Sequence, residues 1–158
     1  MSVDRDDVRW LSESEMSAWR SYIVATLRLR HLLHQELSSE HDVSLVDYEV
    51  LVCMSLQRDK RMRMTELATM LGSTKSRLSH QVGRMEVAGY VQRVRDPDDK
   101  RGVVAELTEA GTALLASAAP THVVGVRTHL IDLLSPEEQA TIATAFHRVA
   151  EHLSDLDT

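Results

Sequence analysis

Between residues 73 and 84 the sequence gathers hydroxyl, guanidinium, imidazole and amide side chains at helical spacing. Leu78, Val82 and Met85 are four and three residues apart, so they would form a buried stripe and leave the other side chains facing outward. The outward set comprises Ser73, Thr74, Lys75, Ser76, Arg77, His80, Gln81 and Arg84. Such side chains hydrogen-bond to the edges of bases or neutralise phosphates, which is the chemistry of a helix that contacts double-stranded DNA.

A second group of cations follows, where two short β-rich runs on either side of an Asp-Pro and Gly turn predict a hairpin. Arg93 and Arg95 alternate along the first run, so both would lie on one face of a strand and follow a phosphate backbone. Lys100 and Arg101 lie in the turn, from which they could enter a minor groove, whose negative potential favours arginine.

These two groups predict a division between base contacts and phosphate contacts. We expect base contacts in the major groove from Ser76, Arg77 or Gln81. Phosphate or minor-groove contacts are expected from Arg84, Arg93, Lys100 and Arg101. Ser73 and Thr74 lie at the N-terminus of the helix, where free backbone N–H groups favour a phosphate.

Charge is unevenly distributed along the 158 residues. The whole chain carries −6, which taken alone argues against a nucleic-acid partner. Residues 58–101, however, hold eleven Lys or Arg and six Asp or Glu, a net +5, whereas the remainder carries −11. A solvated, salt-bridged surface would give the same local excess, so charge alone leaves both interpretations open. The excess does coincide with the predicted helix and hairpin, as expected for an electrostatic footprint.

Two helices are predicted before the basic segment. Apolar residues recur at helical spacing from Ser12, the first residue of a capping-box pattern, to about Leu37. Ser44 or Asp47 can start a second helix. The basic run at residues 58–63 is then expected to be a surface connection.

The order of the next elements predicts a winged helix-turn-helix. Thr65 can cap a short helix that ends at Gly72, a residue suited to a left-handed backbone. Ser73 is the expected cap of the following helix, from about Thr74 to Ala88. A short helix, a Gly turn, a helix with a polar outward face and a basic hairpin follow in the order of that motif.

Two further helices are predicted after the hairpin. Thr108 starts one that runs toward Leu133, and Pro120 predicts a kink near residues 116–120. Ser135 caps the last helix, which is expected to bury Ile142, Phe146, Val149 and Leu153.

Composition favours a helical, cytoplasmic protein. Aromatic residues make up 4%, and six glycines and three prolines are few for a sandwich or barrel. The single cysteine, Cys53, excludes an internal disulfide framework and suits a reducing compartment. The charged N-terminus lacks the apolar core of a secretory signal, and the longest uncharged stretch, residues 110–126, is too short to span a membrane. We therefore expect no membrane partner.

No catalytic arrangement is evident. The sequence has no Gly-rich phosphate loop, nucleophile elbow or His-Glu metal pair. Asp96, Asp98 and Asp99 fall at the hairpin turn, where Asp is favoured for its hydrogen bonds to the backbone. We expect neither an enzyme nor a cofactor or metal site.

Residues 64–111, MTELATMLGSTKSRLSHQVGRMEVAGYVQRVRDPDDKRGVVAELTEAG, resemble the core of the MarR (multiple antibiotic resistance regulator) family. The resemblance rests on the Ser-rich helix start STKSRLS, the GYVQR entry to the wing, the DPDDKRG tip and the LTEAG exit, all in order. It covers nearly the whole chain, and the N-terminal RWLSESEMSAWRSYI resembles a variant common among actinobacterial members.

The resemblance implies an obligate homodimer that binds a palindromic site on double-stranded DNA and regulates transcription, most commonly as a repressor. The fold it implies is mainly α with a small β-hairpin wing. It predicts one domain over residues 1–158, with a winged helix-turn-helix lobe at about 44–107 and dimerisation helices at about 12–40 and 108–156.

Release by a small molecule is also implied by the resemblance. In the family, aromatic acids or other anions commonly bind between the dimer helices and the DNA-binding lobe, and they act by favouring a conformation unsuited to DNA. The candidate lining residues are Trp19, Tyr22, His34, Tyr48 and Met54. Aromatic and Met residues at helical spacing are also ordinary core residues, so this assignment stays open.

Metal sensing and redox sensing are alternatives within the same fold. His31 and His34 share one helical face, but no Cys or acidic cluster stands at clear ligand spacing beside them. Cys53 could react with oxidants, although a thiol between Val52 and Met54 in a helix is ordinarily a buried one.

A protein-interaction module that has lost DNA binding is the third alternative. Such a protein should have lost the cations of the recognition helix or of the wing. This sequence keeps both groups, which favours a DNA-binding regulator.

Overall fold

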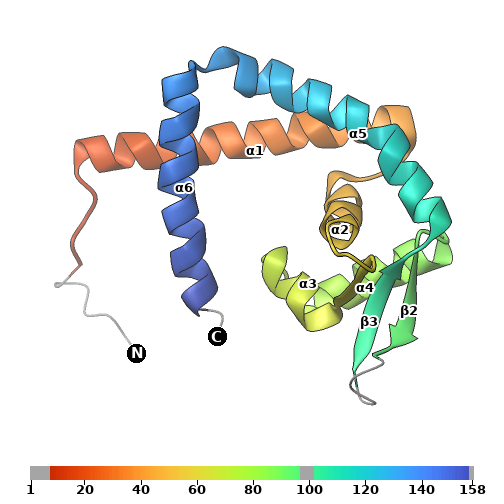
Figure 1. The fold of residues 1–158 in the computed structure, drawn as a ribbon. Coiled ribbons are helices and arrows are strands. Elements are labelled where there is room, and N and C mark those ends of the chain that lie inside the picture. Colours follow the sequence, from red (N-terminus) through yellow and green to blue (C-terminus); the bar gives the residue numbers. More distant parts are fainter. Residues whose placement is uncertain (1–7, 97–101, 157–158) are drawn as a thin grey trace.

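The computed structural model describes residues 8–96 and 102–156, and these form six α-helices and one three-stranded sheet (Figure 1). The helices are α1 (Glu13–His41), α2 (Leu45–Ser55), α3 (Met64–Met70), α4 (Lys75–Val87), α5 (Glu109–His129) and α6 (Pro136–Leu156). The strands are β1 (Arg61–Arg63), β2 (Val91–Arg95) and β3 (Val103–Leu107). The winged helix-turn-helix predicted from the sequence is confirmed. No helix within these described ranges has the length and apolar character to cross a membrane.

The first two helices begin where side chains cap them. Ser12 and Glu15 form the predicted capping box, with the Ser12 amide donating to Glu15 Oε2 at 2.7 Å. Helix α1 runs beyond the predicted end to His41, and Asp42 stops it in a left-handed conformation at φ 53°. Ser44, not Asp47, caps α2: its hydroxyl accepts from the Asp47 amide at 3.1 Å.

The residues at the N-cap positions of α3 and α4 lie one or two positions away from the predicted ones. Helix α3 begins at Met64, so Thr65 lies inside it and is not its cap. Thr74 caps α4, because its hydroxyl accepts from the Arg77 amide at 3.2 Å. Ser73 instead closes the turn, donating its amide to the Ala68 carbonyl at 2.9 Å. Gly72 has the expected left-handed backbone, with φ 56°.

The end of the basic run at residues 58–63 is a strand, contrary to the expectation of a surface connection. Strand β1 pairs antiparallel with β3, with Met62 opposite Ala105, in a sheet of order β1-β3-β2. Met62 is buried, and Arg61 bonds to Glu106 on the facing strand at 2.7 Å. Three residues with one buried apolar side chain between two cations make a short edge strand, a pattern too brief to recognise from the sequence.

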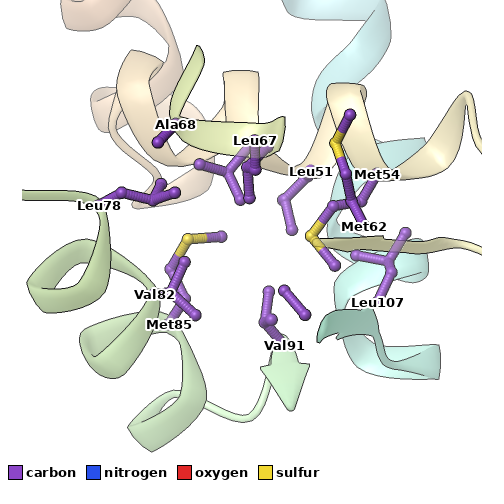
Figure 2. Packing of buried hydrophobic residues seen from close by; sticks show 12 residues of the cluster. Leu51, Met54, Met62, Leu67, Ala68, Leu78, Val82, Met85, Val91 and Leu107 are labelled. Carbon is purple, nitrogen blue, oxygen red and sulfur yellow. The ribbon is translucent and has the colours of Figure 1, made fainter. Parts of the chain in front are cut away.

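Two apolar clusters hold the elements together. In Figure 2 the α4 stripe of Leu78, Val82 and Met85 points toward Leu67 of α3 and Leu51 of α2, and all five are buried. This confirms the predicted stripe.

The second cluster joins α1, α2 and α5 through residues that include Leu33, Leu37, Tyr48 and Ala118. Helix α2 therefore contributes to both clusters, so it connects the long helices to the helix-turn-helix.

Helix α5 contains Pro120 and changes direction along its length in Figure 1, in agreement with the predicted kink.

The last helix differs from the others in burial. Helix α6 begins at Pro136 as predicted, but none of its described residues is buried. Its apolar side chains Ile142, Phe146, Val149 and Leu153 are 38–55% exposed, so the expectation that one copy of the chain buries them is wrong.

Gly111 lies where the start of α5 passes closest to the wing. A Cβ at this position would overlap the Tyr90 carbonyl oxygen and lie 2.8 Å from Leu107 Cδ1. We expect Gly111→Ala to lower the free energy of unfolding by about 2–3 kcal/mol, because the backbone must shift to relieve the overlap. Gly83→Ala is the matched control, since its nearest neighbour would lie at 3.8 Å. Urea unfolding followed by circular dichroism should show the control at least as stable as the wild type; equal stability of both variants would contradict the close approach.

Candidate nucleic-acid interface

Most of the predicted DNA-contacting side chains of α4 lie on one exposed face. Those exposed are Thr74, Lys75, Ser76, Arg77, His80 and Arg84, and Ser73 is half-buried. The side chain of Arg84 is 72% exposed, and its guanidinium lies 3.9 Å from Asp47. The opposite face carries the buried stripe, so the orientation of α4 follows from its apolar spacing.

The N-terminus of α4 is electrostatically open to an anion. Thr74 satisfies one first-turn amide, and residues 75–77 contain two cations and no acid. The first-turn N–H groups and the positive end of the helix dipole favour a phosphate at this end. The local geometry therefore suits contact with a nucleic-acid backbone.

Gln81 does not belong to this face, contrary to our expectation. Its side chain is buried at 9% exposure, and Nε2 donates to the Val46 carbonyl at 2.7 Å. Gln81 lies three residues after Leu78 and four before Met85, so it borders the buried stripe and faces the start of α2. The spacing already carried this signal, but the polar residue type suggested an outward position. In the structure the amide fixes α4 against α2.

Arg93 also has a different setting from the one expected. The side chain was expected to follow a phosphate backbone. In the structure its Nη2 donates to the Ser79 carbonyl of α4 at 2.5 Å. Its amide donates to Glu86 Oε1 at 3.0 Å, and its guanidinium lies 3.6 Å from the same carboxylate. Arg93 therefore holds β2 against α4. Its distant partners in the fold could not be read from a local alternation of residues.

The other predicted cations of the wing divide into two groups. Arg95 is exposed, as its predicted role requires. Lys100 and Arg101 lie outside the described residues. At the base of the wing, the hydrogen bond from Arg61 is the main cause that lowers the pKa of Glu106, with a further contribution from Gln92.

A hollow of about 520 Å³ lies beside the exposed face of α4, between α4 and the helices α1 and α2. Its charged lining includes Arg30, Glu49, Arg77, His80 and Arg84. Arg30 and Glu49 form a two-point salt bridge at 2.6 and 3.0 Å, and this bond raises the pKa of Arg30. Sequence analysis did not identify this hollow, because none of the five candidate ligand residues is among those that line it.

The five candidate ligand residues do not gather at one site. Trp19 and Tyr22 are half-exposed on α1, and Tyr22 lies 4.9 Å from the ring of Phe146 in α6. Nδ1 of His34 accepts from the Leu45 amide at 3.2 Å.

Tyr48 and Met54 are buried in different clusters. The Tyr48 ring lies 4.7 Å from that of His122, and burial raises the pKa of Tyr48 and lowers that of His122. Helical spacing placed these residues on α1 and α2 correctly, but their side chains face different neighbours.

The residues considered for metal and redox sensing are not grouped into a site. His31 is exposed, and Nδ1 of His34 already accepts from the Leu45 amide. Among residues 8–96 and 102–156, no three His, Cys, Asp or Glu side chains are grouped so that they could hold a metal ion. Cys53 is half-buried against the first cluster, and burial raises the pKa of its thiol, which lowers its thiolate fraction.

Arg93 and Arg95 provide a test of the contact between wing and helix. Arg93→Ala should lower the free energy of unfolding by about 1–2 kcal/mol, because it removes hydrogen bonds between β2 and α4. Arg95, two residues later in β2, is exposed. Arg95→Ala removes the same charge and should change the free energy of unfolding by less than about 0.5 kcal/mol. Denaturant unfolding without DNA measures both; equal stabilities would show that Arg93 contributes nothing to holding the wing.

The fold and sequence are similar to those of known transcriptional regulators. The model of the MarR family matches residues 43–103. AbsC, a MarR family transcriptional regulator from Streptomyces coelicolor, is 43% identical, with a TM-score of 0.86 over 92% of this chain and 98% of that one. Sco3205, a MarR family regulator from the same organism solved in complex with DNA, is 41% identical, with a TM-score of 0.86 over 94% and 92% of the chains.

More distant relatives agree. The multiple antibiotic resistance protein MarR of Escherichia coli (strain K12) is 26% identical over 134 residues, which cover 80% of this chain and 92% of that protein. With the exposed cationic helix and the wing in place, these similarities show that the chain belongs to the MarR family of DNA-binding transcriptional regulators and is not an enzyme.

Proposed function

We propose that this protein binds a palindromic operator as a homodimer, represses transcription there, and is released by a small anionic molecule. The observation that carries the proposal is the exposed face of α4, where cationic and hydroxyl side chains surround a helix N-terminus free of acids. A helix in this setting fits the major groove, with its first turns against base edges and phosphates. The Sco3205 relative, which was solved with DNA, supports the assignment.

Within α4 we assign base contacts to Ser76 and Arg77, which lie on the exposed first turn. Phosphate contacts are assigned to the hydroxyls and cations at its margins and on the wing, namely Ser73, Thr74, Lys75, His80, Arg84, Arg95, Lys100 and Arg101. Gln81 and Arg93 are assigned supporting roles, because their polar atoms bind the Val46 and Ser79 carbonyls.

Dimerisation through the terminal helices is supported by the apolar surface that one copy of the chain leaves exposed. Phe146 and Leu153 on α6, and Trp19 and Leu27 on α1, are 41–62% exposed. The two helices touch through Tyr22 and Phe146, and exposed apolar side chains on touching helices mark a protein interface in a soluble protein. A two-fold symmetric pair would present two α4 helices to the two halves of a palindrome.

The hollow beside α4 is our proposed site for the effector. Arg30, Arg77, His80 and Arg84 line it together with Glu49, which pairs with Arg30, so the excess of cations suits a small anion such as an aromatic acid. Because Arg77 and Arg84 are also assigned to DNA, an anion there would compete with the operator for the same cations. It would also contact α1 and α4 together, and so could favour a lobe orientation unsuited to DNA.

Arg77 tests the assignment of α4. The operator probe is the DNA upstream of the protein's own gene, with a scrambled duplex for comparison. Arg77→Ala should weaken specific binding by about tenfold or more and reduce the preference over scrambled DNA, because a base contact carries about 1–3 kcal/mol. Arg148→Ala removes the same charge from exposed α6 and should leave both unchanged. Fluorescence anisotropy at several salt concentrations measures this; wild-type affinity and preference in Arg77→Ala would remove α4 from the interface.

Phe146 tests the proposed dimer. Phe146→Asp places a charge in the exposed apolar face of α6 and should shift the protein from dimer to monomer at micromolar concentration, because the charge would be buried unpaired. Val87→Asp makes the same change at a side chain that is 92% exposed on α4 and should leave the dimer intact. Sedimentation equilibrium distinguishes the two; a dimeric Phe146→Asp would locate the interface elsewhere.

A further inference from the structure

A salt bridge ties the end of β2 that leads into the hairpin turn to the start of the helix-turn-helix. Arg63 Nε donates to Asp96 Oδ2 at 2.7 Å. Arg63 is the last residue of β1 and directly precedes α3, while Asp96 directly follows β2. The pair therefore joins two segments that are far apart in the sequence, at the end of β2 that leads into the hairpin turn.

Asp96 is held on two sides. Its amide donates to the Gly102 carbonyl at 3.0 Å, which closes the hairpin beyond the ends of its strands. Its side chain is only 4% exposed, whereas that of Arg63 is 49% exposed. A carboxylate this buried is costly unless it is paired, and removing one partner of such a pair costs more than the pair contributes in net stability. Such a pair is therefore better explained by the geometry it imposes than by stability.

The residue type at position 63 points to the same conclusion. Arg63 occupies the N-cap position of α3, where Ser, Thr, Asp or Asn would accept a hydrogen bond from the first turn. The structure describes no capping hydrogen bond from the Arg63 side chain to α3. Helix stability thus does not account for an arginine here, whereas the bond to Asp96 does.

We propose that Arg63 and Asp96 are positioning residues, whose ion pair sets the orientation of the wing relative to α4. Arg93 already holds the middle of β2 against α4. The Arg63–Asp96 pair fixes the far end of the same strand against β1 and α3. With both contacts made, the wing and α4 present one continuous surface to a DNA duplex. This inference rests on the proposed DNA-binding function and adds the residues that align its two parts.

Asp96→Asn separates positioning from simple electrostatics. The substitution keeps the shape of the side chain and removes a negative charge beside the DNA-binding surface, so charge alone would strengthen binding or leave it unchanged. Positioning predicts the opposite, a loss of specific affinity of about tenfold. Glu66→Gln removes a negative charge from an exposed position on neighbouring α3 and serves as the matched control. It should bind at least as tightly as the wild type. Wild-type or tighter binding by Asp96→Asn would overturn the proposal.

A double-mutant comparison tests whether the two residues act together. Arg63→Gln should weaken binding, and adding Asp96→Asn to it should cause little further loss, because the pair is already broken. Arg63→Lys, which keeps the charge, should recover part of the affinity. Additive losses in the double variant would show that the residues act independently. Circular dichroism and thermal unfolding establish that each variant is folded at the assay temperature. If Asp96→Asn is unfolded, Arg63→Gln replaces it as the test, because the Arg63 side chain is half-exposed.

A measurement without DNA keeps this inference distinct from the proposed function. Amide hydrogen exchange should be faster in Asp96→Asn at residues 91–95 and 103–107, and unchanged at residues 78–87 of α4. If the wild type shows no specific DNA binding, the proposed function fails, and the exchange data alone decide whether the pair holds the wing. Unchanged exchange in the wing would overturn the inference, even if the wild type binds its operator.

Discussion

Burial of Leu78, Val82 and Met85 against α2 and α3 determines which face of α4 is left in contact with solvent. The cost of exposing three large apolar side chains is several kcal/mol, so no other rotation of this helix about its axis is competitive. The polar face of α4 follows from that rotation. The cations and hydroxyls of the first turns are exposed together, and Gln81, at the edge of the stripe, is turned inward to the Val46 carbonyl.

The same packing connects the exposed face of α4 to the rest of the molecule. Helix α2 contributes to both apolar clusters, and Leu114 and Leu115 of α5 contact both. A change in the angle between the long helices would therefore be transmitted to α4 through packed side chains. The hollow lined by Arg30, Glu49 and Arg77 lies where α1, α2 and α4 meet, so the proposed effector would contact the long helix α1 and α4 at once.

Local patterns predicted most of this fold. Capping residues and the spacing of apolar residues located the helices, and the Gly72 turn placed the helix-turn-helix. The sequence did not reveal contacts between distant segments. Arg93 was assigned to DNA because alternation along a strand says nothing of the Ser79 carbonyl that it contacts. Strand β1 was missed because its pairing with β3 joins residues more than forty positions apart. The exposed face of α6 was predicted to be buried, because an amphipathic pattern does not tell whether its partner is the same chain or another copy.

The most direct test of the account is methylation protection of guanine N7 in DNA from upstream of the gene, because N7 lies in the major groove. Two α4 helices in a symmetric dimer should protect guanines in two half-sites about ten base pairs apart, and Arg77→Ala should abolish that protection at some of them. Protection in two such half-sites would place α4 as described. Saturating protein that leaves every guanine N7 accessible, or protects them without any half-site pattern, would contradict the central claim that α4 reads the major groove.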